Sequence, residues 1–191
     1  MSLATHPRER KSSVSAEFSI VVRRASTADA DSLSSIGSEA FYDAYAGFNA
    51  AQDISAHIEA QYSPAVIRHE MGLPDRFYLL ATVDAAPAGL CKLRIGPAPD
   101  GIPDAASLEI QQLYIDPRHQ RRGIGKVLLD AVLAEARTAR FAGVWLGVWE
   151  QAAWAVNFYS KHGFTKFGLH TFRLGSSEQN DLLMWLSAGN D

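Results

Sequence analysis

Apolar and polar positions follow two periods along this chain of 191 residues and divide it into segments of alternating type. In the first half, short runs rich in β-branched and aromatic residues favour strands, whereas apolar residues three or four positions apart favour helices. Thr27 suits a helix N-cap, because Asp29 and Asp31 follow in the first turn, where the helix dipole favours negative charge. This half is predicted to contain strands over 18–24, 76–83 and 88–95, and helices over 27–45, 50–60 and 64–71.

The second half shows the same two periods more clearly. Ile124, Val127, Leu128 and Ala131 recur at helical spacing, which predicts an amphipathic helix that ends near Arg140. An apolar run stands before this helix and another follows it, and this order is typical of a βαβ unit in a mixed α/β sheet. The predicted strands cover 108–115, 144–149, 165–174 and 182–187, and a further helix covers 152–162.

The apolar phase slips by one residue within the strand predicted at 108–115. Leu108 and Ile110 share one face of the strand by period two. Leu113 comes three positions after Ile110, so in a regular strand it would lie on the opposite face. One extra residue in a strand makes a β-bulge, and bulges re-aim backbone groups near functional sites. The slip predicts a bulge at 111–112; the alternative is an irregular strand end with both glutamines facing water.

The segment after this strand is basic, contains two glycines and leads into a helix. The loop amides from Arg121 to Gly125 would be unpaired donors at a helix N-terminus, where the dipole also favours an anion. Gly123 and Gly125 would let the backbone turn tightly and approach a pyrophosphate, and Arg121 and Arg122 add positive charge. The pattern predicts a phosphate-binding loop, with a plain glycine turn as the alternative.

Two commoner phosphate loops do not fit this segment. A P-loop would need Gly in place of Gln120 and Ser or Thr in place of Val127, and a dinucleotide fingerprint would need Gly in place of Leu128. The spacing Gln/Arg-x-x-Gly-x-Gly, met by Gln120, Gly123 and Gly125, resembles the pyrophosphate loop of the GNAT superfamily of N-acetyltransferases. Members of that superfamily bind acetyl-CoA.

A second motif follows at a fitting separation. The run F-Y-S-K-H-G-F at 158–164 closes the last predicted helix, and Gly163 suits the left-handed position after its end. The same run resembles the second hallmark of the GNAT superfamily. The two motifs together imply the GNAT fold, an α/β fold with a mixed, mostly antiparallel sheet of about seven strands flanked by helices. The bulged strand of that fold corresponds to 107–116.

Further segments resemble one branch of this superfamily, the PaiA-type polyamine N-acetyltransferases. They are G-V-W-E at 147–150, G-L-H-T-F-R-L-G at 168–175 and D-L-L-M at 181–184. There is one departure from the family pattern. Family members usually carry Asn seven residues before the motif tyrosine, where it helps to hold the CoA arm, and Ala152 stands there in this chain.

The resemblance implies roles for individual residues on the donor side. The backbone at Leu113, Tyr114 and Ile115 would pair with the pantetheine arm, and its amides near Leu113 would polarise the thioester carbonyl. Tyr159 would protonate the departing thiolate as a general acid, although it could instead be a core aromatic. The loop residues that would hold the pyrophosphate are Gln120, Arg121, Arg122, Gly123, Ile124, Gly125 and Lys126.

On the acceptor side, an amine must lose a proton before it attacks, because an alkylammonium has a pKa of about 10. The resemblance implies that Glu109 accepts this proton, often through water; a salt-bridge or solvated carboxylate is the alternative. Glu150 is the second candidate for the base and could attract a cationic substrate, and Trp149 beside it would line the cleft. The segment 41–62 would shape the acceptor site.

Composition adds limits to this picture. The net charge of −3 gives no nucleic-acid footprint, and no apolar run is long enough to span a membrane. The single cysteine, Cys91, fits a reducing cytoplasm and is more typical of a small buried hydrophobe than of an acetyl carrier. No His/Cys cluster has metal-ligand spacing. We expect one domain over 16–188 after a disordered tail at 1–15, and a homodimer is possible.

These features predict an acetyl-CoA-dependent N-acetyltransferase that acts by direct attack in a ternary complex. The favoured acceptor is a small cationic amine, a polyamine such as spermidine. An aminoglycoside and a protein N-terminus are alternative acceptors. A non-catalytic acyl-CoA sensor is the alternative from another class, and the departure at Ala152 favours it.

Overall fold

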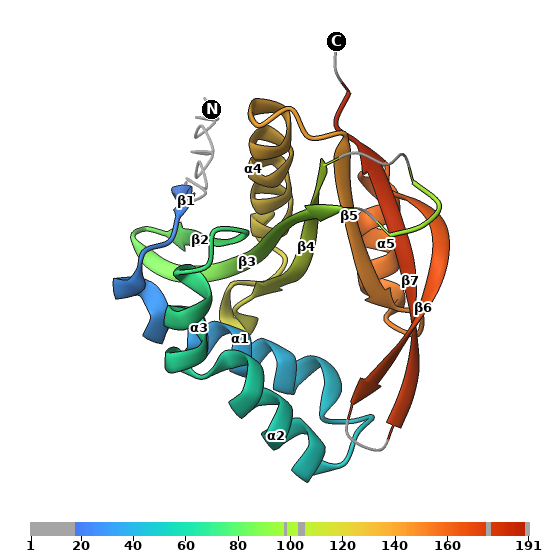
Figure 1. Ribbon diagram of the computed structural model, residues 1–191. Helices are drawn as coiled ribbons and strands as arrows, with labels where there is room; N and C mark the ends of the chain where they lie inside the picture. Colours follow the sequence, from blue (N-terminus) through green and yellow to red (C-terminus); the bar gives the residue numbers. More distant parts are fainter. Residues whose placement is uncertain (1–17, 98, 103–105, 175–176, 190–191) are drawn as a thin grey trace, which may run out of the picture.

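The fold is built on a sheet that lies between helices on its two faces (Figure 1). The computed structural model describes residues 18–97, 99–102, 106–174 and 177–189, so the tail expected at 1–15 lies outside the described residues. Over these ranges the sheet has seven strands in the order β1-β2-β3-β4-β5-β7-β6. Only β4 and β5 run parallel to each other, which confirms the expected mixed, mostly antiparallel sheet.

The element bounds lie within three residues of the predicted ones, except that β7 begins at Ser177, five residues before the predicted start of that strand. The strands are β1 (Ile20–Arg24), β2 (Arg76–Val83), β3 (Ala86–Pro97), β4 (Ala106–Ile115), β5 (Gly143–Trp149), β6 (Thr165–Leu174) and β7 (Ser177–Ser187). The helices are α1 (Ala30–Tyr45), α2 (Ala51–Tyr62), α3 (Pro64–Met71), α4 (Ile124–Thr138) and α5 (Ala153–Lys161).

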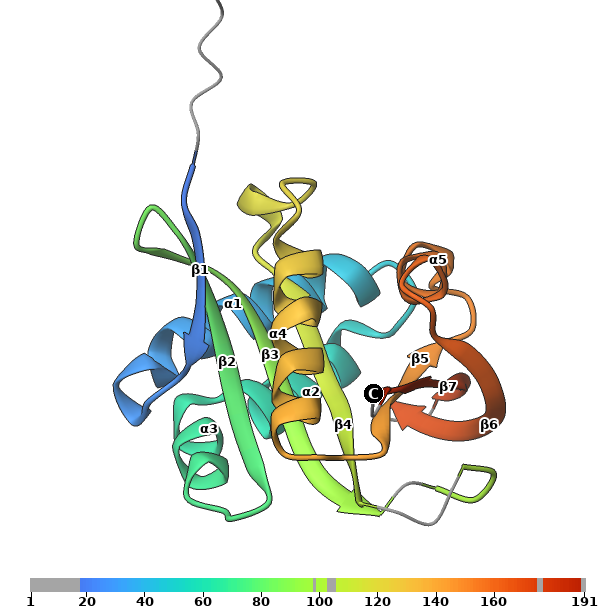
Figure 2. The ribbon, with the colours of Figure 1, turned by 90° about the horizontal axis from the view of Figure 1, so that it is seen from above.

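Strand alternation directs neighbouring side chains into two different cores. Leu80 and Leu90 pack with α1, whereas Leu79 and Cys91 pack with α4 on the other face. Figure 2 shows α4 in front of the sheet with α1 and α2 behind it. Full burial of one leucine side chain contributes about 1.5–3 kcal/mol, so these two layers fix the position of both helices.

The central βαβ unit consists of β4, α4 and β5, as predicted. β4 and β5 pair over a short stretch, where Leu108, Glu109 and Ile110 lie opposite Val144, Trp145 and Leu146. The predicted bulge is also present. On the β3 side, Lys92 lies opposite Gln112 and Leu93 lies opposite Ile110, so Gln111 is the extra residue.

One helix start differs from the prediction and one helix end agrees with it. Thr27 is not the N-cap: it begins a short 3-10 helix, and the Asp29 carboxylate accepts hydrogen bonds from the Ser26 amide and hydroxyl at 2.8 and 3.0 Å. This reciprocal box places the cap one residue earlier. At the end of α5, Gly163 has φ +90°, and the Phe164 amide donates to the Tyr159 carbonyl. The predicted left-handed cap is confirmed.

A buried charge cluster joins α3 to the sheet. The Glu70 carboxylate on α3 accepts hydrogen bonds from Lys92 Nζ at 2.5 Å, from Arg76 at 2.9 Å and from the Tyr78 hydroxyl. Glu70 and Lys92 are both buried. A buried ion pair of this kind adds little net stability, but the loss of one partner leaves an uncompensated charge in the interior.

Substitution of Lys92 by Met should therefore destabilise the fold. We expect the free energy of unfolding to fall by about 3 kcal/mol, measured by urea denaturation with circular dichroism. The matched control is Lys126→Met, which breaks an exposed i,i+4 pair with Asp130 and should cost no more than about 0.5 kcal/mol. Equal losses in the two variants would contradict a structural role for the buried pair.

Candidate active site

A cavity of about 1120 Å³ lies where β4 and β5 separate. Its walls come from β4, β5, the first turn of α4 and α5, with α1 and α2 opposite. Most of the residues predicted from the sequence line it, namely Glu109, Leu113, Tyr114, Ile115, Gln120, Arg121, Gly123, Ile124, Gly125, Lys126, Trp149 and Tyr159. Arg122 and Glu150 are not among the lining residues.

One edge of β4 is open toward this cavity. Leu113 and Ile115 pair with β3 on one side, but on the other side β4 pairs with β5 only as far as Ile110. Beyond that point, the backbone N–H and C=O groups that face away from β3 have no strand partner. An extended amide chain can add to such an edge in the manner of another strand. This open edge fits a pantetheine arm.

The loop before α4 forms a concave set of backbone amides. Arg121 has φ +61° and Gly123 has φ +81°, and α4 starts at the next residue. Within the described ranges, no backbone carbonyl accepts from the amides of 121–125. Left-handed turns that lead into a helix N-terminus make a nest for an anion, so the loop fits a pyrophosphate.

Gly125 does not make the turn of the loop through a left-handed conformation. It lies within the first turn of α4 and is not among the residues with positive φ. A Cβ at this position would stand 3.5 Å from the Phe158 ring, which is an ordinary contact distance, so this position marks where α5 packs against the first turn of α4. The second left-handed position belongs to Arg121, because residue 125 must already have helical backbone angles.

The positive charge of the loop comes from two of the three expected side chains. Arg121 and Lys126 line the cavity. The Arg122 guanidinium instead lies 5.7 Å from the centre of the Phe18 ring, away from the cavity. His119 also lines the cavity, and within the described chain its buried Nδ1 has no hydrogen-bond partner. It is therefore a further polar group that an anion could satisfy.

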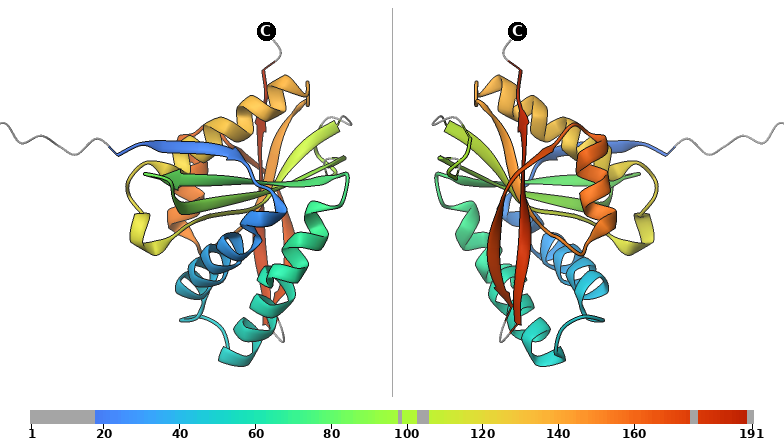
Figure 3. Two further views of the ribbon diagram at one scale, coloured as in Figure 1. Left: turned by 90° about the vertical axis from the view of Figure 1, so that its left-hand side faces the viewer. Right: turned by 90° about the vertical axis from the view of Figure 1, so that its right-hand side faces the viewer.

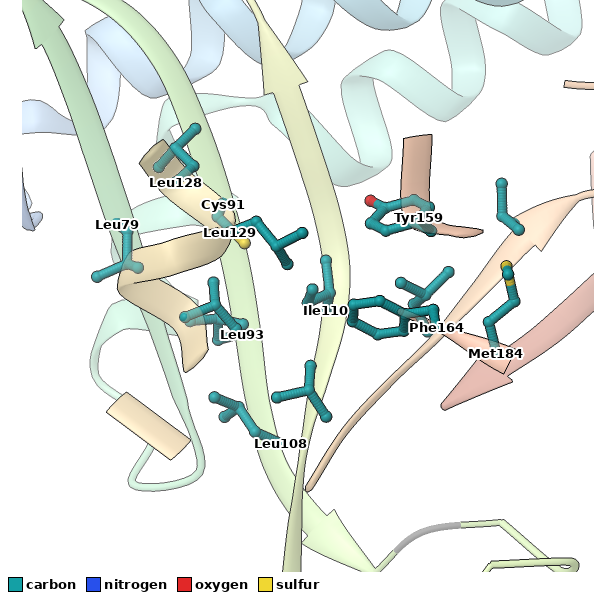
Figure 4. Close-up of a cluster of buried hydrophobic side chains, with 14 of the residues drawn as sticks. Leu79, Cys91, Leu93, Leu108, Ile110, Leu128, Leu129, Tyr159, Phe164 and Met184 are labelled. Atoms are coloured by element: carbon teal, nitrogen blue, oxygen red, sulfur yellow. The ribbon is translucent and has the colours of Figure 1, made fainter. Parts of the chain in front are cut away.

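Tyr159 lies on α5 at the inner end of the cavity. Figure 4 shows its hydroxyl oxygen directed toward β4, with Phe164 below its ring. The side chain is buried, and burial raises the pKa of its phenol well above the usual value, with smaller effects in the same direction from Cys91 and Tyr45. The phenol is therefore protonated at neutral pH, as a proton donor must be.

Glu109 faces the cavity, on the opposite side of β4 from Leu108 and Ile110, as alternation predicted. Glu109 also forms a salt bridge, which was the alternative to a role as the base. Arg94 Nε donates to Glu109 Oε2 at 2.6 Å, and Gln111 Nε2 donates to the same oxygen at 3.2 Å. Over the described ranges, Oε1 has no partner. The carboxylate is thus fixed through one oxygen while the other can contact a ligand.

Glu150 does not line the large cavity. It follows the end of β5, is exposed, and its Oε1 accepts a hydrogen bond from Asn180 at 3.2 Å. It borders a second pocket of about 250 Å³, whereas Trp149 borders both pockets. The Glu150 amide donates to the Asn180 carbonyl, which holds this residue at the strand end.

Asp181 is a candidate that the sequence reasoning missed. It lies on β7, in register with Trp149 on β5 and His170 on β6, and it lines the cavity. Burial raises the pKa of its carboxyl group, and His170 acts in the opposite direction. No cation in the described chain forms an ion pair with it. The available signal was a carboxylate directly before the apolar run L-L-M-W-L.

The described residues contain no group of three or more metal-ligating side chains. None of the helices seen there has the length and apolar character needed to cross a membrane.

Comparison with known proteins agrees with this geometry. Residues 38–164 match the family model described as the acetyltransferase (GNAT) family. An uncharacterized N-acetyltransferase of Lactobacillus delbrueckii is 31% identical over 86% of this chain and 95% of its own length. The spermidine N(1)-acetyltransferase of Thermoplasma acidophilum is 28% identical over 77% of this chain and 89% of its own length.

A solved structure supports the same conclusion and the expected likeness to PaiA. The PaiA N-acetyltransferase of Thermoplasma acidophilum in complex with coenzyme A has a TM-score of 0.71 and 25% identity, and the match covers 88% of this chain and 99% of that one. The open edge of β4 and the amide nest before α4 fit the two parts of the ligand in that complex. The chain belongs to the GNAT family of acetyltransferases and is an acetyl-CoA-dependent N-acetyltransferase.

Proposed function

We propose that this enzyme acetylates a primary amine of a linear polyamine such as spermidine. The observation that carries the proposal is the Asp181 carboxylate, which is desolvated, faces the cavity and forms no ion pair in the described chain, with His170 as its neighbour on β6. A carboxylate in a desolvated position is stabilised when an ammonium group lies beside it. The likeness to a spermidine N(1)-acetyltransferase supports the same substrate class.

The other carboxylates of the cavity wall are already paired. Glu70 is paired with Lys92 and Arg76, and Glu109 is paired with Arg94. Asp181 is therefore the carboxylate most available to a second ammonium group of the acceptor. Trp149 lies opposite Asp181 in register and lines the same cavity, so its ring can add a cation–π contact.

The chain's own groups would bind and orient the donor. Acetyl-CoA supplies the activated thioester when it is bound. Arg121, Lys126 and the amides around Gly123 would hold its phosphates, and the open edge of β4 would align its pantetheine arm. Backbone amides near Leu113 would polarise the thioester carbonyl, because fixed dipoles stabilise the charge that develops there.

Two side chains would move the protons. Glu109 would take a proton from the acceptor ammonium through its free Oε1, directly or through a water molecule. Tyr159 would give its proton to the departing thiolate, because its hydroxyl points toward β4 at the inner end of the cavity (Figure 4). With both substrates held in one cavity, the amine attacks directly and no acetyl group is carried by the enzyme.

Tyr159→Phe tests the proton donor. We expect kcat to fall by roughly a hundredfold or more, because general acid catalysis is lost, while the Kd of acetyl-CoA changes little. Free-thiol release gives kcat, and calorimetry gives Kd. The matched control is Tyr42→Phe, since Tyr42 is exposed on α1 and does not line the cavity. An unchanged kcat in Tyr159→Phe would show that another group protonates the thiolate.

An acceptor panel tests the substrate class. Free-thiol release should be fastest with spermidine and spermine, and slow with lysine, an aminoglycoside and short peptides. Turnover with only peptides or only the aminoglycoside would overturn the polyamine proposal. Acetyl-CoA binding without turnover of any amine would favour a sensor in place of an enzyme that acts on these acceptors.

Asp181→Asn tests the observation on which the proposal rests. We expect the KM for spermidine to rise by roughly ten- to a hundredfold, because a charge-paired contact is lost, whereas the exposed control Asp43→Asn should behave as wild type. Since burial raises the pKa of Asp181, acidification protonates it earlier than an ordinary aspartate. The wild-type KM should therefore rise as the pH falls through this raised pKa, and the KM of Asp181→Asn should not. Equal pH responses would argue against Asp181 as the cation site.

A further inference from the structure

Trp154 occupies an unusual position for a large aromatic side chain. It is 55% exposed, although burial of an indole is normally favourable. The described chain has six exposed large hydrophobic side chains: Phe18, Val21, Tyr42, Phe48, Trp154 and Leu169. Of these six, only Trp154 lines the large cavity. Its ring is therefore presented to whatever fills the mouth of that cavity.

Helix α5 places Trp154 beside the phosphate loop. The Phe158 ring packs against Gly125 in the first turn of α4. Trp154 is one helical turn before Phe158, and residues four apart lie on the same helix face. Figure 3 shows α5 and the yellow segment that precedes α4 on the same side of the strand pair β6 and β7. Trp154 is thus one helical turn from the residue that packs against the start of α4, and both residues line the same cavity as the loop.

Exposure along this helix face shows which end of the cavity is open. Tyr159 is buried, Phe158 is half-buried, and Trp154 is exposed. All three line the cavity, so its depth increases from Trp154 to Tyr159. The thioester end of acetyl-CoA belongs at Tyr159, and the part of the ligand on the outer side of the pyrophosphate belongs near Trp154.

The neighbours of Trp154 leave its ring uncovered. Ala152, Ala153 and Ala155 are small, and Ala152 is fully buried with its amide bonded to the Trp149 carbonyl. Ala152 therefore offers no side-chain hydrogen bond to a ligand. The indole of Trp154 is the one large side chain among residues 152–155 that can contact it.

We infer that the Trp154 indole is a stacking platform for the adenine of acetyl-CoA. Adenine is the planar aromatic part of this ligand, and it lies on the outer side of the pyrophosphate. Stacking of a base on an aromatic side chain typically changes affinity by about tenfold or more. This inference rests on the acetyl-CoA dependence of the enzyme and is independent of the acceptor that it uses.

Binding of the two halves of the ligand to Trp154→Ala tests this assignment. The probes are coenzyme A, adenosine 3′,5′-bisphosphate and acetyl-4′-phosphopantetheine, measured by calorimetry. We expect the Kd of coenzyme A and of the bisphosphate to rise roughly tenfold, while the Kd of acetyl-4′-phosphopantetheine stays unchanged. Trp154→Phe should give a smaller rise. The matched control is Tyr42→Ala, which removes an exposed aromatic outside the cavity and should change none of the three.

Fluorescence gives a second readout that does not depend on affinity alone. The bisphosphate should quench part of the tryptophan emission of the wild-type protein at saturation, and this quenching should disappear in Trp154→Phe. Equal losses of affinity for the two half-ligands would overturn the adenine assignment, and so would unchanged affinity for the bisphosphate in Trp154→Ala. None of these measurements uses an acceptor amine. A result that overturns the adenine assignment would therefore leave the polyamine proposal unaffected.

Discussion

The separation of β4 from β5 is the constraint on which the site depends. The two strands are parallel neighbours only as far as Ile110, and the bulge at Gln111 adds local twist where they part. Tyr159 and Phe164 fill the inner part of the space between the two halves of the sheet (Figure 4). The apolar core thus keeps the strands apart, and the backbone edge of β4 is left free for a ligand.

The charged groups of the cavity wall come from different elements. Arg121 and Lys126 stand beside amides that begin a helix, an arrangement that favours phosphate. The carboxylates of Glu109 and Asp181 lie instead on strands from opposite halves of the sheet. A ligand with phosphates and a ligand with ammonium groups can therefore occupy one cavity with little competition, as the proposed direct transfer requires.

The sequence predicted those features that depend on neighbours along the chain. A phase slip of one residue revealed the bulge, and glycine spacing with helical periodicity revealed the loop before α4. Asp181 was missed because its place in the cavity depends on the register of β7 between β5 and β6, which pairs residues far apart in sequence. The position of Glu150 outside the large cavity depends on the end of its strand, since β5 ends just before it and its side chain borders the second pocket.

Three carboxylates of the described residues line the cavity, and they differ in their hydrogen-bond and ion-pair partners. These partners determine which role each carboxylate can have. Glu70 uses both oxygens on buried partners, so it can join α3 to the sheet but has little capacity left for a ligand. Glu109 has one oxygen held by Arg94 and the other free, which suits a base that must stay in position while it accepts a proton. Asp181 forms no ion pair in the described chain, and burial raises the pKa of its carboxyl group although His170 opposes that rise. In the proposed function an acceptor ammonium would relieve the cost of this burial on binding, so the least satisfied carboxylate would favour a cationic acceptor.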